Sequence, residues 1–400
     1  MRIIRCGMLF DGTGADPQAS RSLVIENGRI ARVLDTEAER RDPAYGDAEI
    51  VDATGQWVMP GLINMHDHLA FRDLIGHPYE NLKAPVTRLS LNAVRNALVA
   101  LRRGWTTVRD MGSSFGVGLH YRDLINDGHL PGPRVLACGS PVSITGGHGY
   151  VLNIEADGPY DVRRAARQQL LAGADFIKIV ASHDPIDIDH PEKTRPEMEI
   201  DEMQAAFDQA RAHGKRTACH VMGTTAVTRV LDAGVDVISH GFYLNDEHAA
   251  RMVEQNVYFD PTLSSYGRQT FNPRLQRGEA WGQRHLALVA PMEASFRAAV
   301  KAGVKIVTGT DSAGRYAEDV EMMRLFGLSA KDSLLACTRN AAGALGLARD
   351  IGTLEAGKIA DIVILAADPL EDPYNLERVD RVVQAGRVMR PSEITLEAVV

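Results

Sequence analysis

Residues 58–68 read VMPGLINMHDH, an apolar run that ends in the pair His66 and His68. Side chains two positions apart in a β-strand point to the same face, so the two imidazoles are expected to converge at the end of this strand. Two convergent neutral imidazoles are ligands that a borderline transition metal favours. A His-x-His pair also occurs on solvated strands, so this interpretation depends on whether partner residues follow.

Candidate partners do follow, each in or just after a later apolar run. They are Lys178, His220, His240 and Asp311. Each has an ordinary structural explanation: strand-end histidines are often hydrogen-bonded in the core, and an aspartate after Gly-Thr often caps a helix. A lysine inside an apolar strand needs an explanation in either case, because a buried ammonium is costly unless it is paired. Taken jointly, the four residues favour a metal site.

Short β-rich runs alternate with helical stretches through the middle of the chain. Eight runs are expected, near residues 58–66, 105–109, 134–138, 175–180, 216–221, 235–240, 257–260 and 304–310. Several helical stretches end in glycine before the next run, as at Gly104 and Gly173, which is a common helix stop. The alternation predicts an α/β protein with a parallel sheet closed into a (β/α)8 TIM barrel. The alternative is a doubly wound open sheet, but the glycine-rich nucleotide loop typical of it is missing from the sequence.

The two ends of the chain have a different pattern, with short strands separated by turn dipeptides such as Asn27-Gly28. Neither end holds enough strands for an independent sheet. We therefore expect residues 1–59 and 346–400 to form one small composite β-sandwich domain, and residues 60–345 to form the catalytic barrel. Two separate terminal hairpins are the alternative.

Composition narrows the class of protein. The 400 residues are 45% hydrophobic and carry a net charge of −8 without a basic block, so a large core is expected and nucleic acid is not an expected partner. The four cysteines are far apart, and the first residues lack the apolar region of a signal peptide. This favours reduced thiols and a cytoplasmic location. No stretch is long enough to span a membrane, and a homo-oligomer is left open.

Seven motifs extend over nearly the whole chain: MPGLINMHDH, GADFIKIV, CHVMGTTAV, VDVISHG, VTGTDSAG, RNAAGALGL and IGTLEAGKIADIVIL. On these motifs the chain resembles the amidohydrolase superfamily. Within it, the chain is similar to the branch with two metals and a carboxylated lysine, which includes imidazolonepropionase-related enzymes, prolidase-like dipeptidases and N-acyl amino acid hydrolases. The resemblance implies a metal-dependent (β/α)8 barrel with a small β-sandwich built from both termini.

The resemblance also implies a six-residue metal site, made of His66, His68, Asp311, His220, His240 and Lys178. The first three would bind the more buried of two divalent ions, the next two would bind the second, and Lys178, as N6-carboxylysine, would bridge them. Zinc is the expected metal, with manganese, cobalt or iron as alternatives. A metal-bridging hydroxide would attack the substrate, and Asp311 would move the proton to the leaving amine.

The expected substrate is a small molecule with an amide bond. The segment SITGGHGY (143–150) is similar to one in relatives that cleave dipeptides and N-acyl amino acids, where the histidine faces the substrate. His148 is thus a candidate catalytic and substrate-binding residue. Arg109 and Arg315 are candidates for holding a substrate carboxylate through a bidentate contact. Tyr243 is a candidate for shaping the pocket.

Three functional hypotheses remain. The leading one is an amide hydrolase of dipeptides or N-acyl amino acids, although Met222 stands where peptidase-like relatives often have a polar or aromatic residue. The second is a ring-opening hydrolase of a cyclic amide or a deaminase of a heterocycle; Lys178 argues against deaminases, which usually lack it. The third is a non-catalytic barrel that serves as a scaffold, which the complete set of metal-site residues disfavours.

Overall fold

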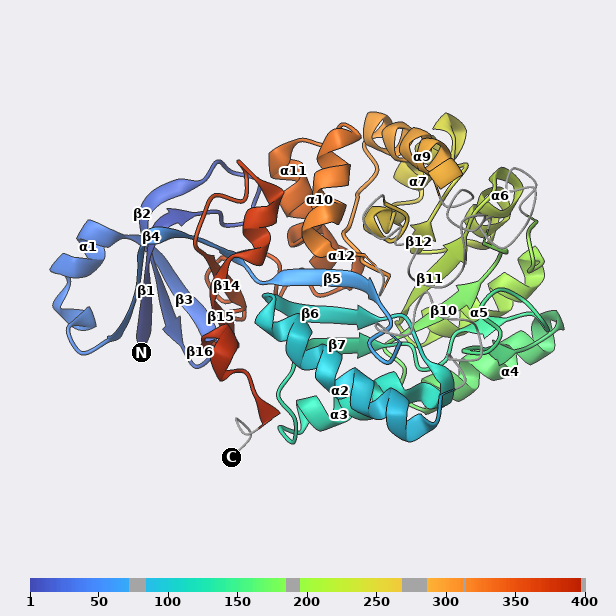
Figure 1. Ribbon diagram of the computed structural model, residues 1–400, viewed down its shortest axis with the longest axis horizontal. Coiled ribbons are helices and arrows are strands. Elements are labelled where there is room, and N and C mark those ends of the chain that lie inside the picture. The colour runs from blue at the N-terminus through green and yellow to red at the C-terminus, as the bar shows by residue number, and fades with distance from the viewer. Residues whose placement is uncertain (72–83, 185–194, 268–285, 312–313, 397–400) are drawn as a thin grey trace.

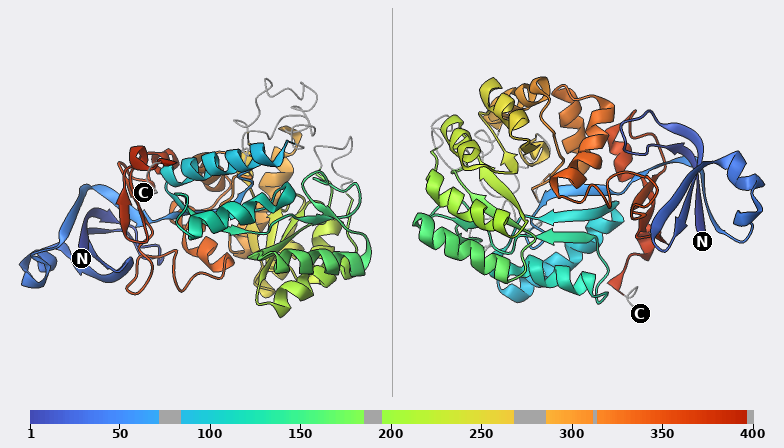
Figure 2. Two further views of the ribbon diagram at one scale, coloured as in Figure 1. Left: turned by 90° about the horizontal axis from the view of Figure 1, so that it is seen from below. Right: turned by 180° about the vertical axis from the view of Figure 1, so that it is seen from behind.

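The computed structural model describes residues 1–71, 84–184, 195–267, 286–311 and 314–396. Strands from both ends of the chain lie together at one end of the molecule, and the intervening strands and helices form a larger α/β part (Figure 1). The same division is visible from below and from behind (Figure 2). No helix within the described ranges is long and apolar enough to cross a membrane.

A seven-stranded sheet joins the two termini, in the order β16-β15-β14-β4-β1-β2-β3. Its strands are β1 (Arg2–Leu9), β2 (Gln18–Glu26), β3 (Arg29–Asp35), β4 (Glu49–Pro60), β14 (Ile362–Leu365), β15 (Val379–Gln384) and β16 (Arg387–Met389). The N-terminal and C-terminal strands meet where β14 pairs antiparallel with β4, with Val363 opposite Met59. The two ends therefore share one sheet instead of forming two separate hairpins.

The turn between β2 and β3 follows from its sequence. Asn27 and Gly28 have φ values of 50° and 75°, and two consecutive positive φ values are typical of the tight hairpin turns that Asn-Gly favours. On one face of this sheet, apolar residues from both termini form a common core, which includes Ile4, Leu23 and Ile364. Burial of this shared face is what holds the two ends of the chain together.

The α/β part contains two sheets with parallel pairing, in the orders β5-β6-β7 and β13-β12-β11-β10-β8-β9. Their strands are β5 (Leu62–Asp67), β6 (Trp105–Asp110), β7 (Arg134–Ala137), β8 (Val142–Ser143), β9 (Ile154–Glu155), β10 (Phe176–Val180), β11 (Arg216–Val221), β12 (Val237–His240) and β13 (Tyr258–Asp260). Every residue of β5, β6 and β10 is buried, as expected for parallel strands covered on both faces.

Segment 304–310, predicted as the eighth strand, differs from the prediction. Only Ile306 forms a bridge there, parallel to Phe259 of β13. On the opposite side, the amide of Met65 in β5 donates to the carbonyl of Thr308 at 2.8 Å. The segment thus contacts strands on both sides, but with too few ladder bonds for a regular strand.

The longer described helices are α2 (Val86–Arg102), α3 (Val117–Asn126), α4 (Gly158–Leu171), α5 (Ile200–Ala212), α6 (Thr224–Ala233), α7 (Asp246–Glu254), α9 (Val289–Ala302) and α10 (Tyr316–Leu325). Two shorter ones follow, α11 (Ala330–Ala336) and α12 (Arg339–Ala344). Helix α2 buries Leu89, Ala93, Ala97 and Leu101 on one stripe, the spacing of an amphipathic helix. Helix α3 was not predicted, because glycines crowd the sequence at its start.

Candidate metal centre

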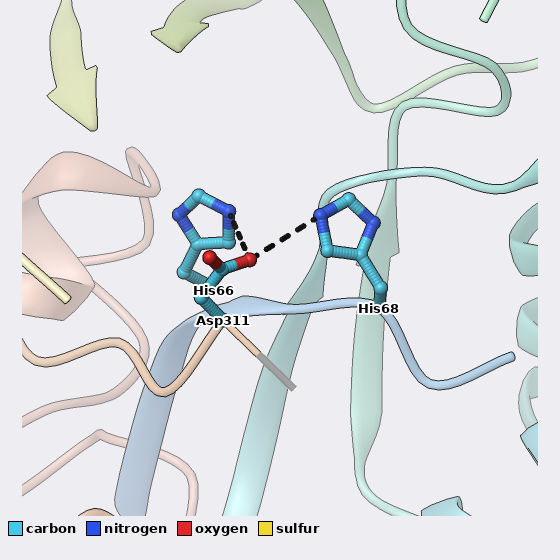
Figure 3. Close-up of side chains that lie close together, drawn as sticks. All are labelled: His66, His68 and Asp311. Carbon is cyan, nitrogen blue, oxygen red and sulfur yellow. Dashed lines mark ion pairs between the residues drawn. The ribbon is translucent and has the colours of Figure 1, made fainter. Parts of the chain in front are cut away.

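Strand β5 presents the His-x-His pair, and the structure brings Asp311 to it. The rings of His66 and His68 have centroids 5.6 Å apart. Oδ1 of Asp311 lies 3.4 Å from Nε2 of His66 and 3.6 Å from Nε2 of His68 (Figure 3). One ligand atom from each residue falls within 4.8 Å of the others. Two imidazoles and a carboxylate around one point are a donor set that suits zinc.

The other nitrogen of each imidazole is engaged with the protein. Nδ1 of His66 lies 3.0 Å from Oδ2 of Asp260, and Nδ1 of His68 lies 2.7 Å from the carbonyl of Gly112. Because both partners accept hydrogen bonds, they favour the tautomer with the proton on Nδ1. This leaves the Nε2 lone pairs facing Asp311, which is the usual arrangement of metal-binding histidines.

His220 and His240 come from the next strands, β11 and β12. Their ring centroids are 4.6 Å apart, and that of His240 is 5.0 Å from that of His66. Nδ1 of His240 lies 2.7 Å from the hydroxyl of Thr262. Nε2 of His220 is buried without a hydrogen-bond partner in the described part of the chain. A buried nitrogen of this kind normally has a partner. A metal ion that accepts the lone pair of Nε2 would provide one.

Burial sets the protonation state of the four histidines. It lowers the pKa of His68 to about 4 and the pKa values of His66, His220 and His240 well below their ordinary range. The positive charge of Lys178 acts in the same direction. The imidazoles are therefore neutral at physiological pH, the form that binds metals.

Lys178 projects from β10 into the same space and is 4% exposed. It makes no hydrogen bond or ion pair with the other residues that the structure describes. Burial lowers its pKa to about 8, and repulsion from Arg109 contributes. A substantial fraction of neutral, nucleophilic amine is therefore present near neutral pH.

Asp311 is electrostatically unusual as well. Burial raises its pKa to about 7, the charge of Lys178 opposes this, and the carboxylate of Asp184 raises it further. Its φ is 44°, a left-handed conformation that costs a non-glycine residue free energy and that is concentrated at functional sites. The hydroxyl of Ser265 lies 3.4 Å from its Oδ2.

These side chains line a cavity of about 90 Å³. Its described lining is His66, His68, Met111, Pro141, His148, Gly149, Leu152, Asn153, Lys178, Val180, Asp184, His220, His240, Tyr266 and Asp311. The ring of His148 stacks on that of His220, with centroids 4.5 Å and planes 14° apart. The backbone amide of His148 donates to Oε1 of Glu197 at 3.0 Å, which fixes the loop. The structure thus brings together His148 and all six predicted metal-site residues.

The two predicted carboxylate-binding arginines do not join them. Nε of Arg109 donates to the carbonyl of Met65 at 2.7 Å, and its Nη2 lies 3.3 Å from Asp260, inside the core. Arg315, directly before the start of α10, pairs with Glu377 at 2.8 Å and is half-exposed. Neither belongs to the described cavity lining. Both arginines serve other ion pairs, and their expected substrate contacts stay a prediction.

Tyr243 is likewise outside the described cavity lining. It packs against the hydrophobic core, and its backbone carbonyl accepts from the hydroxyl of Thr224, whereas Tyr266 lines the cavity. Sequence reasoning missed Asp184 and Asp260 entirely. Asp260 ends β13 as His240 ends β12, so the same strand-end signal could have found it.

Comparison with known proteins agrees with this architecture. Residues 57–389 match the model of the Amidohydrolase family. The chain is 27% identical over 407 residues to the ochratoxinase of Aspergillus niger, covering 92% of this chain and 82% of the relative. It is 26% identical over 391 residues to the imidazolonepropionase of Chromobacterium violaceum, covering 89% and 87%. A solved Xaa-Pro dipeptidase with bound methionine has a TM-score of 0.86 at 28% identity, covering 97% and 99%.

The fold and these similarities define a hydrolytic enzyme with a TIM-barrel-type α/β fold. The chain belongs to the amidohydrolase family. Members of this superfamily use divalent metals, and the relatives identify it as a hydrolase of amide bonds. The scaffold hypothesis is therefore set aside.

Proposed function

We propose that the chain is a binuclear metal-dependent hydrolase that cleaves the amide bond of a dipeptide or an N-acyl amino acid. The observation that carries the proposal is the convergence of His66, His68 and Asp311 with His220, His240 and Lys178 in one cavity. The first three would hold one divalent ion, and His220 and His240 the second. Zinc fits this nitrogen and oxygen donor set best, with manganese, cobalt or iron as alternatives.

Lys178 is proposed to be carboxylated on Nζ. Its neutral amine adds carbon dioxide and releases a proton, which gives a carbamate anion. The product removes the cost of a buried ammonium and supplies oxygen donors between the two histidine sets. The absence of any described partner for the Lys178 amine supports this assignment.

The remaining residues would move protons and orient the substrate. Bound divalent ions supply an activated water and polarise the scissile carbonyl. Asp311 accepts the proton of the attacking water and delivers it to the leaving nitrogen, a task that its position beside both histidines supports. His148, whose backbone amide is held by Glu197, would contact the substrate carbonyl or carboxylate.

We also infer that the parallel strands close into one (β/α)8 barrel, with residues 60–345 as the catalytic domain and with 1–59 and 346–400 as a β-sandwich domain. Backbone hydrogen bonds support closure. Met65 in β5 bonds to Thr308, and Asp175 before β10 donates to Ala137 of β7 at 2.9 Å. These contacts join the edges of the two parallel sheets.

A ring-opening hydrolase of cyclic amides is the second candidate. It is favoured by one observation: the described lining contains no arginine, and a cyclic amide without a carboxylate would not require one. Protein reconstituted with zinc or manganese should be offered dipeptides, N-acyl amino acids and cyclic amides, with product release followed by mass spectrometry. Cleavage of linear amides supports the proposal, and turnover of cyclic amides alone would replace it by the ring-opening function.

A further inference from the structure

A glycine-rich segment follows β6 directly. Residues 112–118 read GSSFGVG, and the segment lacks the lysine of a phosphate-binding loop. Gly112 begins it with a φ of 112°, a conformation that side-chain-bearing residues rarely adopt. Gly118 ends it in the first turn of α3. The contacts of these two glycines lead to the candidate metal ligand His68.

Asp110, the last residue of β6, joins the two pieces of backbone that determine where His68 lies. Its Oδ2 accepts a hydrogen bond from the amide of Leu69 at 3.2 Å, and its Oδ1 accepts one from the amide of Gly112 at 2.9 Å. Leu69 directly follows His68, and the carbonyl of Gly112 lies 2.7 Å from Nδ1 of His68. One carboxylate therefore holds both the backbone that carries the imidazole and the backbone that its Nδ1 contacts.

Helix α3 keeps this carboxylate in place. The hydroxyl of Tyr121 donates to Oδ2 of Asp110 at 2.7 Å, and both side chains are buried. Burial raises the pKa of Tyr121 well above its ordinary value, so its hydroxyl keeps its proton. A Cβ at Gly118 would lie 2.8 Å from Oδ1 of Asp110, closer than two such atoms normally approach. The helix thus gives one carboxylate oxygen a hydrogen bond and leaves room for the other.

The direction of the His68 ring decides whether its Nε2 can bind a metal. That nitrogen lies 3.6 Å from Oδ1 of Asp311, and Nδ1 faces away from Asp311 (Figure 3). His66 has the carboxylate of Asp260 directly at its Nδ1, whereas His68 has only the backbone carbonyl of Gly112. A peptide group that turned would remove this acceptor and release the ring, so the peptide must itself be held.

We propose that Asp110, held by Tyr121 and accommodated by Gly118, is a positioning residue for the metal ligand His68. This inference rests on the proposed metal centre and gives the glycine-rich segment a structural task. The segment turns the chain after β6 so that the carbonyl of Gly112 faces the imidazole and α3 covers the carboxylate. Asp110 is not part of the described cavity lining, and it acts through the backbone.

Three variants disturb the carboxylate in different ways. Asp110→Asn keeps the shape of the side chain but replaces one acceptor by a donor, and Tyr121→Phe removes one hydrogen bond. Gly118→Ala places a methyl group against Oδ1, although alanine favours a helix over glycine. In competition with a chromophoric chelator, Asp110→Asn should weaken one zinc-binding step about 10-fold, the lower end of the range for loss of an outer partner. The other two variants should weaken the same step by a smaller factor.

Each variant has a matched control that should bind zinc as the wild type does. Gly55→Ala changes a glycine of β4 where no described atom lies within 4 Å of an added Cβ. Asp123→Asn changes an exposed carboxylate of α3 that pairs with Arg122, and Tyr160→Phe changes an exposed tyrosine of α4. Thermal stability is measured in parallel, and if Asp110→Asn does not fold, the other two variants decide.

The state of the His68 ring gives a readout that a merely structural role would not move. Metal-free protein with ¹⁵N-labelled histidine is observed by NMR, and His68→Gln assigns the signals. In the wild type, the ring should carry its proton on Nδ1, and Asp110→Asn should shift it toward a mixture of both tautomers. Unchanged zinc affinity in the variants, or weaker affinity with an unchanged His68 tautomer, would overturn the positioning role. If the wild type binds no zinc, the proposed metal centre fails, and the tautomer alone decides whether Asp110 positions His68.

Discussion

Nδ1 of His66 lies 3.0 Å from Oδ2 of Asp260, and Nη2 of Arg109 lies 3.3 Å from the same oxygen. All three side chains are buried. Burial raises the pKa of Asp260 to about 6, and the guanidinium of Arg109 opposes that rise. Arg109 thus has a clear structural role. It helps to keep a carboxylate ionised beneath the imidazole that faces Asp311.

Replacement of this carboxylate should weaken metal binding. Asp260→Asn keeps the shape but offers a neutral acceptor, so the imidazole of His66 is less basic and less well oriented. Loss of such an outer partner typically costs 10- to 100-fold in metal affinity. Competition with a chromophoric chelator measures the change.

The matched control is Asp236→Asn, at the opposite end of the same sheet. Asp236 precedes β12 and accepts hydrogen bonds from Thr217 and Arg216, so its removal should lower stability without altering metal affinity. An Asp260→Asn protein that binds metal as tightly as the wild type would show that the carboxylate does not orient His66.

Strand-end residues were predictable because the carboxyl ends of parallel strands meet at one edge, so His66, His220 and His240 converge whatever the loops do. The direction in which a side chain points was harder to predict from the sequence. Arg109 lies near the end of β6, but alternation along the strand aims it into the core. Arg315 follows Asp311 closely in sequence, yet its side chain pairs with Glu377 and is not part of the described cavity lining.

The place of Asp184 in the cavity lining could not be predicted for a different reason. It depends on the path of the loop after β10, which brings it to Tyr266, a residue 82 positions away. No periodicity in the sequence encodes such a contact. The same holds for Thr262, which contacts His240 and has a φ of 50°. Loops position these two residues, whereas His66, Lys178, His220 and His240 lie in strands.

Substitution of Lys178 tests whether its carbamate bridges two metal ions. Lys178→Ala should bind fewer than two metal equivalents and lose activity, with partial rescue by short carboxylic acids that replace the carbamate. Wild-type protein equilibrated with ¹³C-bicarbonate should show a carbamate carbon signal that the variant lacks. Lys305→Ala, which removes a lysine hydrogen-bonded to Asn256, is the control. Two fully bound metals beside an unmodified Lys178 amine would exclude the bridge.

Asp311→Asn should reduce kcat by about 10²- to 10⁴-fold, the range for loss of a general acid or base. The amide retains a possible oxygen ligand but cannot carry the proton. Metal content must be measured with the rate, because Asp311 is also a candidate ligand. Asp350→Asn, an exposed carboxylate near Arg29, should match the wild type. A near-normal kcat in Asp311→Asn would rule out the proton-transfer role.

Asp319 of α10 supports the wall of the site and gives a pH-dependent prediction. Its Oδ1 accepts a hydrogen bond from the amide of Ser264 at 2.9 Å, and its Oδ2 is buried without a partner among the described residues. Burial raises its pKa to about 8, and the negative charges of Asp260 and Glu318 add to this. The folded protein therefore holds a proton that the unfolded chain releases near pH 4.

Because the folded-state pKa is raised, this group stabilises the fold fully at low pH, and the contribution is lost as pH rises from about 4 to about 8. The asparagine of Asp319→Asn cannot ionise, so this variant should not lose stability in this way as the pH rises. The difference in free energy of unfolding, variant minus wild type, should thus grow between pH 5 and pH 8 by on the order of a few kcal/mol. Urea unfolding at several pH values measures it, and Asp332→Asn is the control with an exposed carboxylate at the start of α11. A difference that stays constant across this range would show that Asp319 is ionised in the folded protein throughout.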